Sequence, residues 1–455
     1  MDRPGRGLLA LALDSRLSGR RVVVLGAGST GEAFCAALRR LDDDVSITVV
    51  ERHLVGGECT FYACMPSKTL LRSPELAAAA RIAPGSRLGP LEVAEIFEWR
   101  DRITSNWEDG QNTSFLTDRR IELVRGDARV SAPGRVAVGE RELEFDDLVV
   151  ATGSSAAIPP LAGLADVEYW TTQDATSAHA VPESLLVLGG GVAGCELAQL
   201  YSRLGARVTI VQRGRLMPRV HADAGALVAD AFREEGIAVE VGATVERVEP
   251  GIRVSLADGR VLEADALLVA TGRRPNAEGL GLEQLGVSIG PRGIETDEYL
   301  QAAPGVWAIG DVNGVALFTH VGKYQARVAA ANVAGHRRPA DYRAIPAAAF
   351  TDPQVATVGR TDGDGLVTAE WRIDRTSRAS TFERPKRRGF VRLYAEPAER
   401  VLVGAVAVGP ESGEWLQQIT LAIRARVPVD VLRDTIQPYP TFSEALFFAA
   451  RDLPL

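Results

Sequence analysis

The chain contains few cysteine, histidine and lysine residues, and it has no long apolar run. Four cysteines among 455 residues are too few for the disulfide scaffold of a secreted protein of this size. No apolar run of about 18 residues occurs, so we expect no membrane-spanning helix. The net charge of −8 and the lack of a basic run argue against a nucleic-acid partner. We therefore expect a cytoplasmic protein without a membrane or nucleic-acid partner.

The length and the N-terminus set two further expectations. A chain of 455 residues with 46% hydrophobic and 24% charged residues has room for about three domains, each with its own core. The apolar stretch at residues 8–13 is short, ends at Asp14 and lacks a signal-peptide cleavage pattern. We interpret it as a mobile leader or a short helix.

A glycine-rich turn lies between two predicted strands near the N-terminus. RVVVL at 21–25 predicts a buried strand, GAGSTG follows at 26–31, a helix is expected from 32 to about 41, and ITVVE at 47–51 predicts the next strand. In such a unit the first glycine makes the turn, the second lets a pyrophosphate approach and the third permits close helix packing. The helix N-terminus favours phosphate. The predicted dinucleotide site comprises Gly26, Gly28, Gly31 and Glu51.

The same pattern returns in the middle of the chain. LLVL at 185–188 leads into GGGVAG at 189–194, a helix is expected to about 204, and VTIVQ at 208–212 predicts a strand. Two such units imply two different dinucleotides. The predicted second site comprises Gly189, Gly191, Gly194 and Gln212.

Gln212 bears on which nucleotide binds at the second site. Aligning ITVVER with VTIVQR places Gln212 opposite Glu51, and an acid at that position would repel a 2′-phosphate. The acid is absent, and Arg213 and Arg215 stand nearby, which suits a 2′-phosphate. The alternative is that both arginines are ordinary surface charge. We favour NADPH over NADH, with NADH still possible.

Two cysteines lie close together in GGECTFYACMPSK at 56–68. Cys59 and Cys64 have no second CxxC and no nearby histidine at metal-ligand spacing, so we expect no metal site. A redox-active pair and a structural pair both remain open from spacing alone. Pro66 suits the first turn of a helix, which would put Cys64 just before a helix N-terminus that lowers the pKa of a thiol. Cys35 and Cys195 lie on the predicted helices after the two glycine turns and are expected to be packed and inert.

These motifs together resemble those of the flavoprotein pyridine nucleotide-disulfide oxidoreductases. Besides the features above, the chain carries ATG at 151–153, ATGRRPN at 270–276, AIGD at 308–311 and TDPQVATVG at 351–359. The resemblance covers nearly the whole chain and implies an α/β fold with two Rossmann-like domains, the second inserted in the first, and a C-terminal α+β dimerisation domain. It also implies a homodimer. The expected domains are 1–157 with 275–340 for FAD, 158–274 for NAD(P) and 345–455 for dimerisation.

The resemblance assigns FAD to the first dinucleotide site. Glu51 would bind its ribose, Asp311 the ribityl-phosphate region, and Ala128 would lie near the adenine. Thr319 and His320 would begin a helix whose N-terminus faces the flavin, although His320 could equally be a packed or capping residue. The remaining expected contacts with the two dinucleotides are Thr152, Gly153, Gly272 and Gly310.

The resemblance also assigns roles around the cysteine pair. Cys64 would be the thiolate next to the flavin, and Cys59 the thiol that meets the outgoing substrate. Lys68 is one of only three lysines in the chain, and it matches the family's flavin-facing lysine. Glu196 matches its carboxylate partner, with an ordinary helix-face carboxylate as the alternative.

The C-terminal motif departs from the family's thiol reductases. Those members carry a histidine, paired with a glutamate, where this chain has Tyr439 and Glu444, and no histidine follows His336. The ordinary pKa of tyrosine, about 10, makes it a poor base at neutral pH, so we expect poor turnover of dihydrolipoamide or glutathione disulfide. Tyrosine is typical of mercuric reductase-like and transhydrogenase-like members. Transhydrogenases usually lack the second cysteine, and mercuric reductases need a vicinal cysteine pair at the C-terminus, so neither match is complete.

The sequence therefore predicts an FAD-dependent NAD(P)H oxidoreductase. Electrons would pass through a redox-active Cys59–Cys64 disulfide to a small-molecule acceptor, which could be a disulfide, a quinone or another compound. Phe61 and Tyr62, which are bulkier than the family's usual residues there, either reshape access to the pair or simply pack. One alternative is a dihydrolipoamide dehydrogenase that works despite Tyr439. Another is a flavin-bearing redox sensor with little turnover.

Overall fold

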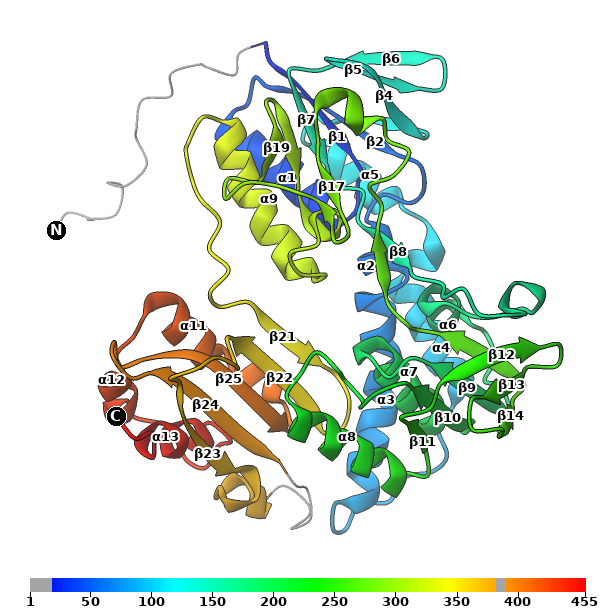
Figure 1. The fold of residues 1–455 in the computed structure, drawn as a ribbon, viewed down its shortest axis with the longest axis vertical. Coiled ribbons are helices and arrows are strands. Elements are labelled where there is room, and N and C mark those ends of the chain that lie inside the picture. Colours follow the sequence, from blue (N-terminus) through cyan, green and yellow to red (C-terminus); the bar gives the residue numbers. More distant parts are fainter. Residues whose placement is uncertain (1–18, 382–388) are drawn as a thin grey trace. The chain divides into compact units, whose positions relative to one another are not determined.

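The computed structural model describes residues 19–381 and 389–455, and Figure 1 shows its ribbon. The expected leader at 8–13 lies outside the described residues. Two compact units make up the chain. Unit 1 combines Met1–Cys59, Trp107–Ser155 and Arg274–Ala340, and unit 2 combines Thr60–Asn106, Ala156–Arg273 and Asp341–Leu455.

Unit 1 is built on a six-stranded sheet in the order β19-β20-β7-β1-β2-β3. Its strands alternate between two cores, as a period of two requires. In β1, Val22 and Val24 join the cluster with Phe34, whereas Val23 and Leu25 join the cluster on the other face. Helices α1 and α9 pack against each other, and a small sheet, β4-β5-β6, completes the unit. The bounds are β1 Arg21–Leu25, α1 Ser29–Leu41, β2 Ser46–Glu51, α5 Gly110–Thr117, β3 Glu122–Arg125, β4 Ala128–Ala132, β5 Arg135–Val138, β6 Arg141–Glu144, β7 Asp147–Val150, β17 Ile289–Gly290, β18 Gly293–Ile294, β19 Gln301–Ala303, β20 Val306–Ala308 and α9 Thr319–Val333.

Unit 2 contains a second parallel sheet, in the order β11-β10-β9-β15. It is also buried on both faces, because Leu185 and Val187 of β9 face one cluster while Leu186 and Leu188 face another. Helix α3 packs against α7 and α4. The bounds are α3 Cys64–Ile82, α4 Val93–Ile103, α6 Thr172–Ser177, β9 Ser184–Leu188, α7 Val192–Arg203, β10 Arg207–Gln212, α8 Ala222–Glu234, β11 Ala238–Val241, β12 Val245–Glu249, β13 Arg253–Leu256, β14 Val261–Glu263 and β15 Ala266–Val269.

The C-terminal part of unit 2 is an antiparallel sheet in the order β21-β22-β25-β24-β23, with helices packed against it. The motif that opens this region in the sequence ends in β22. The bounds are β21 Pro346–Ala349, β22 Gln354–Gly359, β23 Val367–Arg372, β24 Phe390–Glu396, β25 Val401–Gly409, α10 Ser412–Trp415, α11 Gln417–Ala425, α12 Val429–Asp434 and α13 Glu444–Arg451. The short elements α2 Gly57–Phe61, β8 Ser154–Ala156 and β16 Arg273–Pro275 complete the α-helices and strands, and six 3-10 helices lie between them in the described residues.

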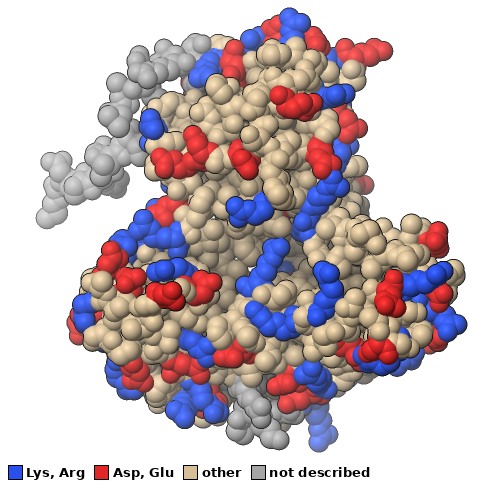
Figure 2. Space-filling view, in the orientation of Figure 1, with Lys and Arg blue, Asp and Glu red and all other residues tan. Residues whose placement is uncertain are grey.

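The predicted α/β class and both strand–turn–helix–strand units are confirmed. The first helix begins at Ser29 rather than at 32, because the glycine-rich turn already supplies its first residues. Helix α2 was not predicted, since five residues are too few for a periodic pattern. Across the described parts of the chain, no helix has both the length and the apolar character needed to span a bilayer. Figure 2 shows acidic and basic side chains scattered over the viewed face.

Candidate active site with two dinucleotide cradles

The glycine-rich turn of unit 1 forms a tight cradle at the start of α1. Gly26 has φ +99°, and a Cβ atom there would lie 2.5 Å from the carbonyl oxygen of Ala151. A Cβ on Gly31 would lie 2.0 Å from the carbonyl oxygen of Gly26, so α1 approaches β1 as only glycine permits. Gly28 is less crowded, because a Cβ atom there would lie 3.8 Å from its nearest neighbour, Gly57 Cα. The crowded first and third glycines and the more open second one fit a bound pyrophosphate.

Glu51 lies at the end of β2 beside this turn. Its Oε2 accepts a hydrogen bond from the backbone N–H of Ala27 at 2.8 Å, and its Oε1 accepts one from His53 N at 2.8 Å. Both contacts hold the carboxylate at the carboxyl end of the strand, where a ribose would need it. The cradle and this carboxylate together fit the adenosine diphosphate part of FAD.

The other predicted FAD contacts in unit 1 are joined by hydrogen bonds. Thr152 and Asn276 are linked twice, by Thr152 Oγ1 to Asn276 O at 2.7 Å and by Asn276 Nδ2 to Thr152 O at 2.9 Å. The carbonyl of Gly153 accepts from Asn276 N at 2.9 Å. Asp311 accepts from Ser154 Oγ at 2.6 Å. The role of Asn276 was missed, although its place in ATGRRPN was noted.

The remaining predicted residues of unit 1 lie at the starts of elements. Helix α9 begins at Thr319, as expected, and the His320 ring stacks on Phe318 with centroids 5.1 Å apart. Gly310 has φ +80°, and its N–H donates to Gln325 Oε1 at 2.6 Å. Ala128 is the first residue of β4.

The second cradle, in unit 2, repeats the first. A Cβ on Gly189 would lie 2.4 Å from Ala270 O, and one on Gly194 would lie 2.0 Å from Gly189 O, whereas Gly191 has open space. Gln212 Oε1 accepts from Gly190 N at 2.9 Å, the counterpart of the contact that Glu51 makes. Gly272, with φ +157°, lies beside Ala157.

The two arginines beside Gln212 differ in their surroundings. Arg213 is exposed. Arg215 is exposed as well, but it donates to the carbonyls of Met217, Pro218 and Val220, at 3.0, 2.9 and 2.6 Å. These contacts hold the Arg215 guanidinium on its own loop, and its expected role beside a 2′-phosphate stays a prediction.

The cysteines lie at two helices close in sequence. Cys59 is within α2, and Cys64 is the first residue of α3, preceded by Ala63 as the N-cap. The expectation that Cys64 lies just before the helix was therefore wrong by one residue, and Pro66 is still in the first turn. Cys59 and Cys64 are half-buried residues, whereas Cys35 and Cys195 are buried. Burial raises the pKa of each of these two thiols to about 12, which makes them poor nucleophiles.

Lys68 and Glu196 form an ion pair in unit 2. Lys68 Nζ lies 2.7 Å from Glu196 Oε2, with the glutamate side chain 5% exposed and the lysine 37% exposed. The other carboxylate oxygen accepts from Phe350 N at 2.9 Å, and Lys68 Nζ lies 4.7 Å above the Phe350 ring. Phe350 was missed, and no sequence signal placed it beside Glu196.

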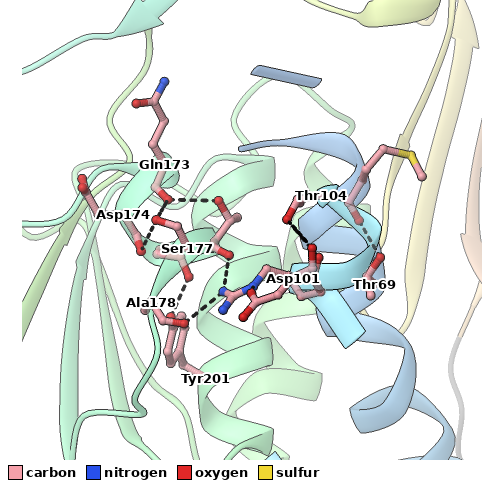
Figure 3. Close-up of polar contacts among 12 residues, drawn as sticks. Thr69, Asp101, Thr104, Gln173, Asp174, Ser177, Ala178 and Tyr201 are labelled. Carbon is pink, nitrogen blue, oxygen red and sulfur yellow. Dashed lines mark hydrogen bonds and ion pairs between the residues drawn. The ribbon is translucent and has the colours of Figure 1, made fainter. Parts of the chain in front are cut away.

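A polar network anchors the chain just before Cys64, and Figure 3 shows polar contacts of this region with Asp101, Ala178 and Tyr201 among the labelled residues. Phe61 is buried, and the carbonyl of Tyr62 accepts from Thr176 Oγ1 at 2.7 Å. The Thr176 carbonyl in turn accepts from the buried guanidinium of Arg100 at 2.6 Å, and Tyr201 OH donates to Ala175 O at 2.6 Å. Packing therefore explains Phe61, and burial raises the pKa of Tyr62.

Tyr439 and Glu444 occupy the C-terminal part of unit 2. Tyr439 is 75% exposed, whereas Glu444 is 7% exposed. The Glu444 carboxylate accepts from Thr441 N at 3.1 Å and Ser377 N at 3.4 Å. Within residues 19–381 and 389–455, no group of three or more His, Cys, Asp or Glu is arranged to hold a metal ion.

Comparison with known proteins identifies the family. The pyridine nucleotide-disulphide oxidoreductase family matches residues 20–336, and the dimerisation domain of that family matches residues 345–450. A mercuric reductase from Acidithiobacillus ferrooxidans is 36% identical over 468 residues, covering 95% of this chain and 83% of the relative. Dihydrolipoyl dehydrogenase 2 from Haloarcula marismortui is 33% identical, covering 95% of this chain and 96% of the relative.

A solved structure supports the same conclusion. LpdA from Mycobacterium tuberculosis has a TM-score of 0.84 at 28% identity, covering 95% of this chain and 99% of LpdA. Each unit contains one glycine cradle, unit 2 also contains the Lys68–Glu196 ion pair, and the family matches cover residues 20–336 and 345–450. The chain therefore belongs to the pyridine nucleotide-disulphide oxidoreductase family, whose members are FAD-dependent enzymes that use a pyridine nucleotide.

Proposed function

We propose that this protein oxidises NADPH in preference to NADH and passes the electrons through Cys59 and Cys64 to a small acceptor. The observation that carries the proposal is the ion pair of Lys68 with Glu196 at 2.7 Å. Lys68 is four residues after Cys64 in α3, so the two side chains share a helix face. Bound FAD would supply the chemistry that joins hydride removal from a nicotinamide to reduction of a disulfide.

The charged side chains of Lys68 and Glu196 are held in fixed positions by their contacts. Glu196 is fixed by Phe350 N, and it fixes the Lys68 ammonium in turn. Cys64 is the first residue of α3, and the positive end of a helix dipole favours a thiolate there. These contacts support an ordered electron route and argue against a flavin-bearing sensor with little turnover.

The preference for NADPH rests on the second cradle. Gln212 makes its contact with Gly190 N without a negative charge, and exposed Arg213 follows it. A 2′-phosphate beside Gln212 would meet a guanidinium rather than a carboxylate, which is the charge arrangement that NADPH binding needs.

The acceptor is where this chain departs from its dihydrolipoyl dehydrogenase relatives. A tyrosine is ordinarily a poor base at neutral pH, so the presence of Tyr439 leads us to propose that dihydrolipoamide is not the principal partner. Relatives named mercuric reductase reach 36% identity, which makes Hg²⁺ a second candidate for direct assay. The dimerisation-domain match supports a homodimer, and we retain the proposed domains 1–157 with 275–340, 158–274 and 345–455.

An anaerobic titration tests the proposal. Addition of NADPH to the purified holoenzyme should produce a long-wavelength absorbance band, from a Cys64 thiolate beside the flavin, before the flavin itself bleaches. NADH should do so more slowly. Cys59→Ser and Cys64→Ser are the matched variants. Bleaching without the band, in the wild type, would contradict the route through the cysteines.

A further inference from the structure

A short segment of the dimerisation domain lies against helix α7 within unit 2. Residues 350–353 join β21 to β22, and the side chains of α7 that contact this 350–353 segment are Glu196, Gln199 and Arg203. Their spacing of three and four residues places them on one face of the helix. The helix that follows the second glycine cradle therefore holds the segment with a row of three side chains.

Gln199 pairs with the segment as a neighbouring strand would. Its Oε1 accepts a hydrogen bond from Asp352 N at 2.7 Å, and its Nε2 donates to Asp352 O at 2.9 Å. Gln199 is 1% exposed, so both bonds are shielded from competing water. They hold the backbone of Asp352 at a fixed distance from α7.

Arg203 holds the carboxylate of the same aspartate. Its Nη2 lies 2.8 Å from Asp352 Oδ2 and 2.6 Å from Glu235 Oε1. Glu235 Oε1 also accepts from Gln199 Nε2 at 3.0 Å, which joins the two α7 side chains to one carboxylate. The backbone and the side chain of Asp352 are thus both fixed, two residues after Phe350.

Phe350 contacts both members of the Lys68–Glu196 ion pair. Its N–H donates to Glu196 Oε1 at 2.9 Å, and the centroid of its ring lies 4.7 Å from Lys68 Nζ. A cation over an aromatic ring is attracted by the negative face of that ring. Since the lysine ammonium is carried on a flexible four-carbon stem, an ion pair alone would let it move around the carboxylate, and the ring removes part of that freedom.

We propose that Phe350 is a positioning residue for Lys68, and that the 350–353 segment thereby gives the dimerisation domain a second role, in the redox site of its own chain. This inference rests on the proposed function, in which Lys68 belongs to the electron route. Phe350 acts through the ammonium and requires no contact of its own with the nucleotide or the acceptor.

The first test measures the reactivity of the Lys68 amine and needs neither nucleotide nor acceptor. The holoenzyme is labelled with a trace of acetic anhydride at pH 8, and acetylated Lys68 is quantified by peptide mass spectrometry relative to Lys323, which is practical in a chain with three lysines. Phe350→Leu keeps the backbone N–H and removes the ring, and Phe350 is 38% exposed, so the variant should fold. Loss of the cation–π contact should raise the relative acetylation of Lys68 about 2- to 5-fold, and an unchanged ratio would overturn the inference.

The second test asks whether the ring acts through Lys68. Flavin reduction by NADPH is followed by anaerobic stopped-flow absorbance in Phe350→Leu, in Lys68→Met and in the double variant. Phe350→Leu should slow reduction about 2- to 5-fold when Lys68 is present and should have no further effect in Lys68→Met, because the group that the ring positions is gone. An equal loss in both backgrounds would show that the ring only supports the fold, and would refute the inference.

Two further variants complete the design. Phe350→Tyr keeps an aromatic ring and should restore both readouts to the wild-type values. Phe447→Leu removes a half-buried aromatic ring from α13 of the same domain and should change neither; a rise in Lys68 acetylation equal to that of Phe350→Leu would contradict the specific role of Phe350. If NADPH bleaches the wild-type flavin without a long-wavelength band, the proposed route through the cysteines is wrong, and the acetylation ratio and the double variant still decide the role of Phe350.

Discussion

Gln212 accepts a hydrogen bond from the backbone N–H of Gly190 at 2.9 Å. Glu51 makes the same contact with Ala27 at 2.8 Å in the other unit. The two cradles thus keep one geometry while differing by one charge. We expect that difference to favour NADPH at the second cradle, because a carboxylate repels a 2′-phosphate and an amide does not.

Arg213→Ala should reduce the preference for NADPH. Loss of one charge-assisted hydrogen bond costs about 1.5–3 kcal/mol, so kcat/KM for NADPH should fall about 10- to 100-fold while that for NADH changes little. Steady-state kinetics with both nucleotides measure the ratio. Arg215→Ala is the matched control, expected to lower Tm through its loop contacts and leave the ratio intact; an equal fall with both nucleotides for Arg213→Ala would argue against 2′-phosphate binding.

Lys68→Met should leave the buried Glu196 carboxylate with Phe350 N as its remaining described polar contact. Unfolding should cost about 1–2 kcal/mol less, a loss smaller than for a fully buried pair because Lys68 is partly exposed. Urea denaturation followed by fluorescence measures the stability, and stopped-flow absorbance measures slower reduction by NADPH. Lys68→Arg keeps the charge but not the compact ammonium, so it should recover stability more fully than rate.

Tyr439→His should introduce dithiol activity. A base with a pKa near neutrality contributes about 10²–10⁴-fold to proton transfer, so oxidation of dihydrolipoamide should rise by at least about 10-fold. An NAD⁺-linked assay measures it, with Tyr439→Phe as the control that should show no gain. If wild type already turns over dihydrolipoamide at about 1–1000 per second, the tyrosine is not the barrier that we infer.

Arg100→Met should destabilise the region before Cys64. The substitution leaves the carbonyls of Thr176 and Ala178 without the guanidinium that now donates to them at 2.6 and 3.0 Å. Removal of one partner from a buried charged network costs about 3–5 kcal/mol, which thermal unfolding should register as a lower Tm. Exposed Arg102→Met is the control in the same helix, and a similar Tm for both variants would mean that the network contributes little.

Glu32 should make stability depend on pH. Burial raises the pKa of its carboxyl group above the ordinary value of 4.5, so the folded protein binds more protons than the unfolded one as pH rises through that window, and stability falls. The Tm advantage of Glu32→Gln over wild type should therefore be larger at pH 8 than at pH 4.5. Asn112→Ala removes a donor that stabilises the carboxylate and should shift Tm in the opposite direction at pH 8.

The sequence predicted the elements whose local pattern is strong. Buried strands such as 21–25 and 185–188, and the glycines that end them, follow from rules that act over a few residues. The alignment of Gln212 with Glu51 also held in three dimensions, because both end the second strand of the same unit.

The sequence did not predict contacts that depend on distant chain segments. Phe350 N donates to Glu196 across 154 residues, and a backbone donor leaves no mark in the sequence. The contacts of Arg215 with the carbonyls of its own loop were likewise not predicted, because a side chain can turn back onto its own loop. Glu32 directly follows the third glycine in the sequence, but its hydrogen bond from Asn112 joins residues 80 positions apart.

Gly31 and Gly194 each leave no room for even one methyl group, since a Cβ there would lie 2.0 Å from the carbonyl oxygen of the first glycine in its own turn. Each unit thus contains one glycine, at the same place in its cradle, that cannot be replaced by a larger residue without a steric clash. We expect a substitution at either glycine to weaken the binding of the dinucleotide in its own unit more than the binding in the other unit. A substitution at Gly194 should therefore give a protein that retains its flavin, and a substitution at Gly31 should give one that binds only the nicotinamide nucleotide.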